Sequence, residues 1–152
     1  MGVSVKIWLM TQIDRRAVRL VARDVRTGDI WLGVSGRSGS TKFPGGGVEE
    51  GETLEQAAAR ELNEESGGGL IVIGMTYLGE MMETLGENKA FSHWLRKGSV
   101  VQASYFLVDT MSKPAAGDDV SGWISVGVEG VEALLTYDTQ KEGFRRLVKS
   151  RL

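Results

Sequence analysis

Residues 46–68 of the chain read GGVEEGETLEQAAARELNEESGG, and this stretch determines most of what the sequence predicts. Thr53 and Gln56 have the spacing of a capping box, in which each side chain bonds a backbone N–H group at the start of a helix. The residues that follow favour helix, and the glycines at 67–69 should end it. We therefore predict a helix at residues 54–66.

This helix would carry three glutamates on or beside its apolar face. At about 100° per residue, its apolar side chains share one face that should be buried: Leu54, Ala58 and Leu62. Glu61 and Glu65 lie within or next to this stripe, and Glu64 lies on its flank. Like charges at helical spacing repel by roughly a few tenths of a kcal/mol per pair, and burial raises that cost. A divalent cation would remove it, because Mg²⁺ prefers oxygen ligands such as carboxylates, waters and phosphates.

The alternative is a solvated surface helix, since glutamate is common there by propensity alone. The position of the carboxylates on the apolar stripe argues against it, and so does the segment that precedes the helix. Residues 35–51 are rich in glycine and contain Pro44, which predicts a sharply bent loop. Backbone N–H groups and the positive dipole end of the helix would suit phosphate oxygens there. The residues alone leave both interpretations open.

The rest of the chain predicts a mixed sheet between helices, in one domain spanning residues 1–152. Runs of β-forming residues predict strands at 3–12, 17–25, 30–34, 70–75, 100–109 and 123–128, with a charged turn at 14–16. The first three strands should form an antiparallel meander. Helices are expected at 131–135 and 139–152, where Phe144, Leu147 and Val148 form a stripe that would pack on the sheet. Residues 113–122 should be a loop, and the polar segment 83–98 has no assignment.

Composition excludes several kinds of site. The chain is 41% hydrophobic and 25% charged, as ordinary folded domains are. Its net charge is −2 and it has no block of Lys and Arg, so polymeric nucleic acid is not expected as a partner. Cysteine is absent, which excludes disulfides, thiolate metal sites and a cysteine nucleophile. Because His93 is the only histidine, a bound metal would be held by oxygen atoms.

The chain has no segment of the kind that enters a membrane. No run approaches the roughly 20 apolar residues of a membrane span. Residues 1–11 do not have the pattern of a signal peptide. We therefore expect no membrane partner and a cytoplasmic location.

Eight residues stand at the spacing of the Nudix box, G-x5-E-x7-R-E-U-x-E-E-x-G-U, in which U is an apolar residue. They are Gly46, Glu52, Arg60, Glu61, Leu62, Glu64, Glu65 and Gly67. The chain departs from the motif only at its last position, where Gly68 stands in place of an apolar residue. This departure involves none of the charged residues of the motif. The sequence FPGGGVE at 43–49 also matches, so the chain resembles the Nudix hydrolases.

The resemblance implies an α/β (α+β) fold, a Nudix-like α/β/α sandwich with a mixed central sheet. It implies Mg²⁺- or Mn²⁺-dependent cleavage of the phosphoanhydride bond in a nucleoside diphosphate linked to another group X. This class includes nucleoside triphosphates, ADP-ribose and other nucleotide sugars, dinucleoside polyphosphates, and capped or triphosphorylated RNA ends. Two other functions stay open: a Nudix-fold sensor that binds a nucleotide or sugar nucleotide without hydrolysis, and a general interaction domain. All box carboxylates are present, which favours the enzyme.

The resemblance also assigns roles to site residues. The metal ligands would be the carboxylates of Glu61, Glu64 and Glu65 and the backbone carbonyl of Gly45. Two further catalytic residues, Glu52 and Arg60, would orient the ligands through an ion pair. The general base is left open.

Several acids could serve as that base. Glu61 is one candidate, and Asp118 and Asp119 in a later loop are others, although such an aspartate pair is also typical of a plain turn. Glu80 and Glu83 are weaker alternatives, which could simply be solvated.

The substrate would be a nucleotide-like small molecule. Contacts to it are expected from the loop before the helix and from the unassigned segment: Gly46, Gly47, Lys42, His93 and Trp94. Residues 91–94 would form a lid or a base-binding loop, or else an ordinary connection with one anchored tryptophan. Other aromatic side chains, such as Trp31, Tyr77 and Tyr105, are more often part of a core. Many members of the family that this chain resembles are dimers, so a homodimer is the expected assembly.

Overall fold

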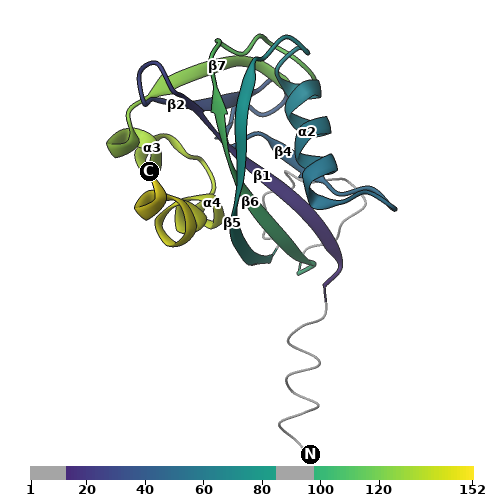
Figure 1. Ribbon diagram of the computed structural model, residues 1–152. Coiled ribbons are helices and arrows are strands. Elements are labelled where there is room, and N and C mark those ends of the chain that lie inside the picture. Colours follow the sequence, from purple (N-terminus) through teal and green to yellow (C-terminus); the bar gives the residue numbers. More distant parts are fainter. Residues whose placement is uncertain (1–12, 85–97) are drawn as a thin grey trace, which may run out of the picture.

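The computed structural model describes residues 13–84 and 98–152, and these form a sheet with helices on both faces (Figure 1). The strands are β1 (Arg15–Asp24), β2 (Ile30–Ser35), β3 (Thr41–Lys42), β4 (Gly45–Gly47), β5 (Val72–Thr84), β6 (Val100–Thr110) and β7 (Val120–Val126). The helices are α2 (Leu54–Glu65), α3 (Val131–Leu134) and α4 (Asp138–Gly143). A 3₁₀ turn (Val128–Gly130) precedes α3, and α4 continues into a π turn (Phe144–Val148) and a 3₁₀ turn (Lys149–Arg151).

The described strands form one mixed sheet, whose main order is β3-β2-β1-β6-β5. β1 and β6 run parallel from Arg15 opposite Val101 to Asp24 opposite Thr110, and the other strand pairs are antiparallel. One edge of β1 is shared, because β4 pairs with its first half and β2 with its second half. The predicted mixed central sheet is confirmed.

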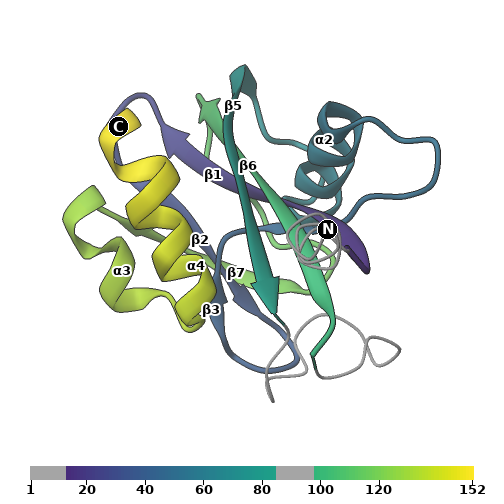
Figure 2. The ribbon, with the colours of Figure 1, turned by 90° about the horizontal axis from the view of Figure 1, so that it is seen from below.

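Helix α2 covers one face of the sheet, and α3 and α4 cover the other, as Figures 1 and 2 show. The core on the α2 side consists of Val18, Leu20, Ala57, Ala58, Leu62, Phe106 and Val108. The larger core on the α4 side consists of Val21, Ile30, Leu32, Phe43, Leu78, Ala103, Tyr105, Leu107, Val131, Leu135, Phe144 and Val148. The two buried faces confirm the predicted α/β/α sandwich.

Helix α2 begins and ends within one residue of its predicted bounds. Thr53 Oγ1 accepts a hydrogen bond from Gln56 N at 3.1 Å, and the Gln56 side chain accepts one from Thr53 N at 2.9 Å, so the capping box is complete. Gly67 and Gly68 follow the helix with φ angles of 74° and 85°, which glycine adopts without strain. The glycines therefore stop the helix where the sequence predicts.

Several predicted strand bounds are wrong, and in each case a partner strand decides the outcome. β1 begins at Arg15, inside the predicted charged turn, because Arg15 pairs with Val101 of β6. β5 continues to Thr84 instead of ending near residue 75, since β6 pairs with it along that length. The predicted loop at 35–51 contains the short strands β3 and β4, and β7 starts at Val120 rather than at residue 123.

Some predictions concern residues outside the described ranges. These are the strand at 3–12 and the lid or base-binding loop at 91–94, with His93 and Trp94. Within residues 13–84 and 98–152, no helix combines the length and the hydropathy that crossing a bilayer requires.

Candidate active site

The glycine-rich turn brings β4 against helix α2. Gly45 has a φ of 153°, and a Cβ at this position would lie 2.0 Å from the carbonyl oxygen of Val18, so a larger residue does not fit. The N–H of Gly45 donates to Glu65 Oε2 at 3.0 Å. A Cβ on Gly46 would lie 2.5 Å from Glu61 Oε1. The backbone of the turn therefore packs directly on two glutamates of the helix.

Arg60 is the centre of a hydrogen-bond network beside these glutamates. Its Nε donates to Glu52 Oε2 at 2.6 Å and its Nη2 to Glu52 Oε1 at 2.9 Å, which makes a bidentate pair. Nη1 donates to Glu61 Oε1 at 2.9 Å, and Nη2 also donates to the Gly47 carbonyl at 2.9 Å. Glu64 Oε2 lies 3.5 Å from Nη1. One guanidinium group therefore orients Glu61 and ties the helix to β4.

The three helix glutamates differ in exposure. The side chains of Glu61 and Glu64 are 12% and 41% exposed, and Glu65 is 5% exposed. Burial raises the pKa of Glu61, an effect that its bond from Arg60 opposes. Burial also raises the pKa of Glu65 to about 7, against the opposing charge of Lys42. The predicted placement of Glu61 and Glu65 on the buried side of the helix is confirmed.

The oxygen atoms of the helix glutamates and of the glycine-rich turn are suitable ligands for a hard divalent cation. The carboxylates of Glu61, Glu64 and Glu65 line one cavity together with Gly45, and Mg²⁺ binds such oxygen donors. As they stand, Glu61 and Glu64 face Arg60 while Glu65 bonds Gly45. No three acidic or histidine side chains in the described ranges are already gathered into a metal-binding group. A cation would favour the charged form of the buried carboxylates, which burial alone disfavours.

The cavity has a volume of about 280 Å³ and carries both signs of charge. Its acidic residues come from α2 and the loop before β7: Glu61, Glu64, Glu65, Asp118 and Asp119. Its basic residues come from β1, β3 and the loop after β2: Arg15, Arg19, Lys42 and Arg37. Basic groups bind phosphate oxygens, and carboxylates hold divalent cations. The lining therefore suits a phosphate-bearing ligand together with a metal ion.

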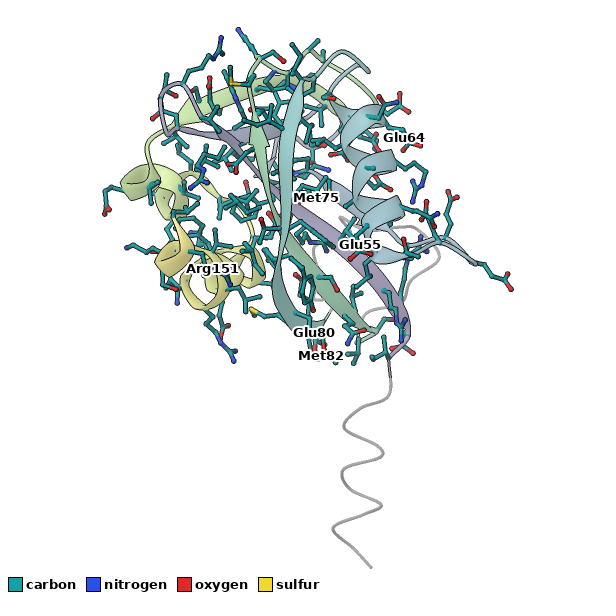
Figure 3. All side chains as sticks on the ribbon, in the orientation of Figure 1. Glu55, Glu64, Met75, Glu80, Met82 and Arg151 are labelled. Carbon is teal, nitrogen blue, oxygen red and sulfur yellow. The ribbon has the colours of Figure 1, made fainter. Side chains whose placement is uncertain are left out.

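Most predicted site residues within the described ranges meet in this cavity. Those that line it are Lys42, Gly45, Gly46, Gly47, Glu61, Glu64, Glu65, Asp118 and Asp119. Glu52 and Arg60 do not line it but bond to Glu61 or to one another. Glu80 is exposed near one end of β5 (Figure 3), and Glu83 is 2% exposed, so the expectation that Glu83 could be solvated is wrong. Neither of these two lines the cavity.

Besides Arg37, four polar residues that line the cavity were not identified from the sequence: Arg15, Arg19, Tyr137 and Gln140. Arg15 and Arg19 stand four residues apart on β1 and therefore face the same side of the sheet. The alternation of side chains along a strand would identify both arginines if the predicted strand began at Arg15 instead of residue 17. Gln140 Oε1 accepts a hydrogen bond from Phe43 N at 2.9 Å, across 97 positions of the chain. No local signal predicts such a contact.

The Glu52–Arg60 pair should make a pH-dependent contribution to stability. The hydrogen bonds from Arg60 lower the pKa of Glu52 from 4.5 to about 2. A lowered pKa in the folded state stabilises the protein above the unfolded-state value, and the contribution is lost as pH falls toward the folded-state value. Glu52→Gln should therefore lower the midpoint of urea unfolding at pH 7, and its difference from wild type should shrink between about pH 5 and pH 3.

A matched control for this prediction is Glu50→Gln, since Glu50 is an exposed acid of the same loop. Its urea midpoint should stay close to that of wild type at every pH. A midpoint difference for Glu52→Gln that stays constant from pH 5 to pH 3 would show that the pair does not titrate in this way.

Comparison with known proteins gives a family model and a set of similar folds. The sequence model of the NUDIX domain family matches residues 4–147. The solved structure of the E. coli dihydroneopterin triphosphate pyrophosphohydrolase is similar, with a TM-score of 0.70 and 14% identity over 90% of this chain and 99% of that chain. A MutT protein from Methanosarcina mazei Go1 has a TM-score of 0.70 and 20% identity over 93% of this chain and 96% of that chain. A search of curated proteins found no match. At these identities the solved structures show the fold alone.

Proposed function

The chain belongs to the NUDIX domain family of hydrolases, and from this premise we propose that it is a divalent-metal-dependent pyrophosphohydrolase. It cleaves the phosphoanhydride bond of a nucleoside diphosphate linked to another group X, with Mg²⁺ or Mn²⁺ as the cofactor. The group X is a further phosphate, a sugar, a second nucleotide or an RNA chain.

One observation carries this proposal: a single cavity gathers three helix glutamates, two loop aspartates and several basic side chains. A diphosphate needs positive charge around its oxygens, and the cavity supplies it through Lys42 and Arg15. A metal bound to the carboxylates adds more of that charge. Burial disfavours the charged form of these carboxylates, and a domain that only binds other proteins would gain nothing that offsets this cost.

Some residues of the Nudix box would bind the cation, and others orient the residues that bind it. Glu61, Glu64 and Glu65 would hold the cation together with the carbonyl oxygen of Gly45. A cation bound there would polarise the phosphoryl oxygens and lower the pKa of the attacking water. Arg60 keeps Glu61 oriented through the 2.9 Å bond from its Nη1.

Phosphate binding and proton removal involve other residues of the cavity. Lys42 and Arg15 bring positive charge to the phosphate oxygens of the substrate. The attacking water must lose a proton to a nearby base. Glu61, Asp118 and Asp119 are the candidates for this base, and all three line the cavity.

Turnover of a substrate panel tests the proposal. The panel contains the common nucleoside triphosphates, dihydroneopterin triphosphate, ADP-ribose, diadenosine tetraphosphate and a triphosphorylated RNA, each with Mg²⁺ and with EDTA. Triphosphates come first, because a structural neighbour is named for a triphosphate substrate. We expect hydrolysis of at least one compound, abolished by EDTA, and H₂¹⁸O labelling will identify the phosphorus that is attacked. If calorimetry shows binding but nothing is hydrolysed, the protein is a nucleotide sensor instead.

Two further expectations accompany this proposal. A cytoplasmic location fits a nucleotide substrate, and cell fractionation tests it. A homodimer follows from the resemblance to dimeric hydrolases, and light scattering during gel filtration tests it.

A further inference from the structure

The loop before β7 is seated on the end of helix α2. We call residues 113–119 the acidic loop, since it ends in Asp118 and Asp119. The N–H of Asp118 donates to the carbonyl of Glu64 at 2.9 Å, and the N–H of Ala115 donates to the carbonyl of Ser66 at 3.2 Å. The last carbonyls of a helix have no partner within the helix. The acidic loop therefore supplies donors that the end of α2 needs.

Glycines on both sides make this close contact possible. A Cβ on Gly117 would lie 2.3 Å from the Glu64 carbonyl oxygen and 2.6 Å from the Glu65 carbonyl carbon. On the helix side, a Cβ on Gly67 would lie 2.7 Å from the Ala116 carbonyl oxygen. Such distances are shorter than a real Cβ allows, so neither position accepts even alanine without a shift of the backbone.

The acidic loop also contacts β7 and the loop after β2. Trp123 Nε1 on β7 donates to the Ala115 carbonyl at 2.7 Å. The Asp119 carbonyl accepts a hydrogen bond from Gly36 N at 3.1 Å, and the Asp119 carboxylate bonds Arg37 Nη2 at 3.0 Å. With these contacts to α2, β7 and the loop after β2, the two loop aspartates line the same cavity as the helix glutamates.

We infer that Gly117 is a positioning residue for the reaction: by letting the acidic loop contact the backbone of α2, it sets where Asp118 and Asp119 stand relative to Glu64 and Glu65. The inference rests on the proposed hydrolase function. Of these contacts, only the bond from Arg37 uses an aspartate side chain, so the placement of the loop depends mainly on its backbone atoms. Gly117 lies outside the box motif, and its role depends on the packing of two segments far apart in the chain.

An alanine at position 117 should displace the loop by a catalytically important amount. The Cβ would have to move away from the Glu64 carbonyl oxygen by at least about 0.7 Å to reach the shortest distance that real Cβ atoms show. Misplacement of reacting groups by about 1 Å can reduce the rate roughly 10²-fold. We expect Gly117→Ala to lower kcat by about 10- to 100-fold. KM should change by less than about threefold, because the side chains that we propose to bind phosphate, Arg15 and Lys42, lie on β1 and β3.

The kinetic test compares Gly117→Ala with Gly69→Ala in the full-length, Mg²⁺-loaded enzyme. Gly69 is the matched control, because it follows the same helix but has open space around it and no left-handed backbone. Both variants are assayed on the substrate that wild type hydrolyses best. Gly69→Ala should retain the kcat of wild type, and equal kcat values for the two variants would overturn the inference.

A double-mutant cycle separates positioning from a general loss of structure. Gly117→Ala is combined with Asp118→Asn and Asp119→Asn, which alone should also lower kcat. If Gly117 acts by placing the aspartates, its substitution should change kcat by less than about twofold once both are replaced. If it lowers kcat by the same factor in both backgrounds, its role is merely structural and the inference fails.

Amide hydrogen exchange tests the seating of the loop without relying on activity. In Gly117→Ala, peptides covering residues 113–119 and the end of α2 should lose protection, whereas Gly69→Ala should resemble wild type. Unchanged protection in Gly117→Ala would overturn the inference even if no substrate is found. An inactive wild type would count against the proposed function alone.

If Gly117→Ala fails to fold, Trp123→Phe replaces it in the cycle. This substitution keeps an aromatic ring but removes the Nε1 bond to Ala115. It should lower kcat by a smaller factor, and that loss should disappear when both loop aspartates are replaced. An equal loss in both backgrounds would overturn the inference.

Discussion

A Glu64→Gln variant is expected to lose on the order of 10²- to 10³-fold in kcat. A bound metal contributes several kcal/mol of transition-state stabilisation, and each 1.36 kcal/mol corresponds to a factor of ten. Glutamine keeps the shape of the side chain but removes the charge that a divalent cation needs. Because Glu64 is 41% exposed and on the flank of α2, its replacement should leave the fold intact. The kcat is measured with Mg²⁺, and the affinity for Mn²⁺ is measured by calorimetry. The Mn²⁺ affinity should fall at least about tenfold.

The control for this variant is Glu55→Gln on the same helix. Nine positions at about 100° each place Glu55 and Glu64 on opposite faces of α2, and Figure 3 shows the two side chains apart. Glu55 is exposed and does not line the cavity. Its substitution should leave both kcat and Mn²⁺ affinity unchanged. If Glu64→Gln behaves in the same way, Glu64 is not a metal ligand.

Removal of one partner from the Arg19–Glu83 ion pair is expected to lower the free energy of unfolding by about 3–5 kcal/mol. Arg19 Nη2 donates to Glu83 Oε1 at 3.0 Å, and each side chain is 2% exposed. The pair joins β1 to β5, with β6 between them in the sheet. Glu83→Ala would remove the carboxylate that pairs with the buried charge of Arg19. Burial keeps water from solvating that charge in its place. Urea unfolding at pH 7 measures the loss.

Two comparisons show whether burial is the cause. The double variant Arg19→Met, Glu83→Met removes both charges and should be close to neutral or stabilising, by up to about 4 kcal/mol. Glu142→Gln interrupts an exposed pair, because Glu142 and Arg146 are 51% and 65% exposed. That change should cost at most about 0.5 kcal/mol. If Glu83→Ala costs no more than Glu142→Gln, the Arg19–Glu83 pair does not form in solution.

The central helix and its carboxylates were predictable because their determinants are close together in sequence. The capping box and the terminating glycines depend on residues within one or two helical turns. The apolar stripe predicted that Glu61 and Glu65 would be on the buried side of the helix. The side chain of Glu61 is 12% exposed, and the whole residue Glu65 is 5% exposed. Helical periodicity transfers directly from sequence to structure.

Strand bounds were less predictable because a strand depends on its neighbour. Residues 70–75 predict a short strand, yet β5 extends to Thr84 because β6 pairs with it along the way. The same pairing turns Glu83 inward toward Arg19, 64 positions away, although the local sequence suggests a solvated acid. β-structure of this kind is set by cross-strand contacts more than by local preference.

By itself, the sequence determined the central helix, the mixed sheet between helices and the set of acids that lies on the buried side of that helix. Only the tertiary structure decided which residues share a cavity with those acids: the basic residues of β1, the loop aspartates that the Gly117 contact brings close, and Gln140 of α4. The physical reason is the range of the interactions. Helix periodicity and capping act over a few residues, whereas strand pairing and loop packing join residues that no local pattern connects.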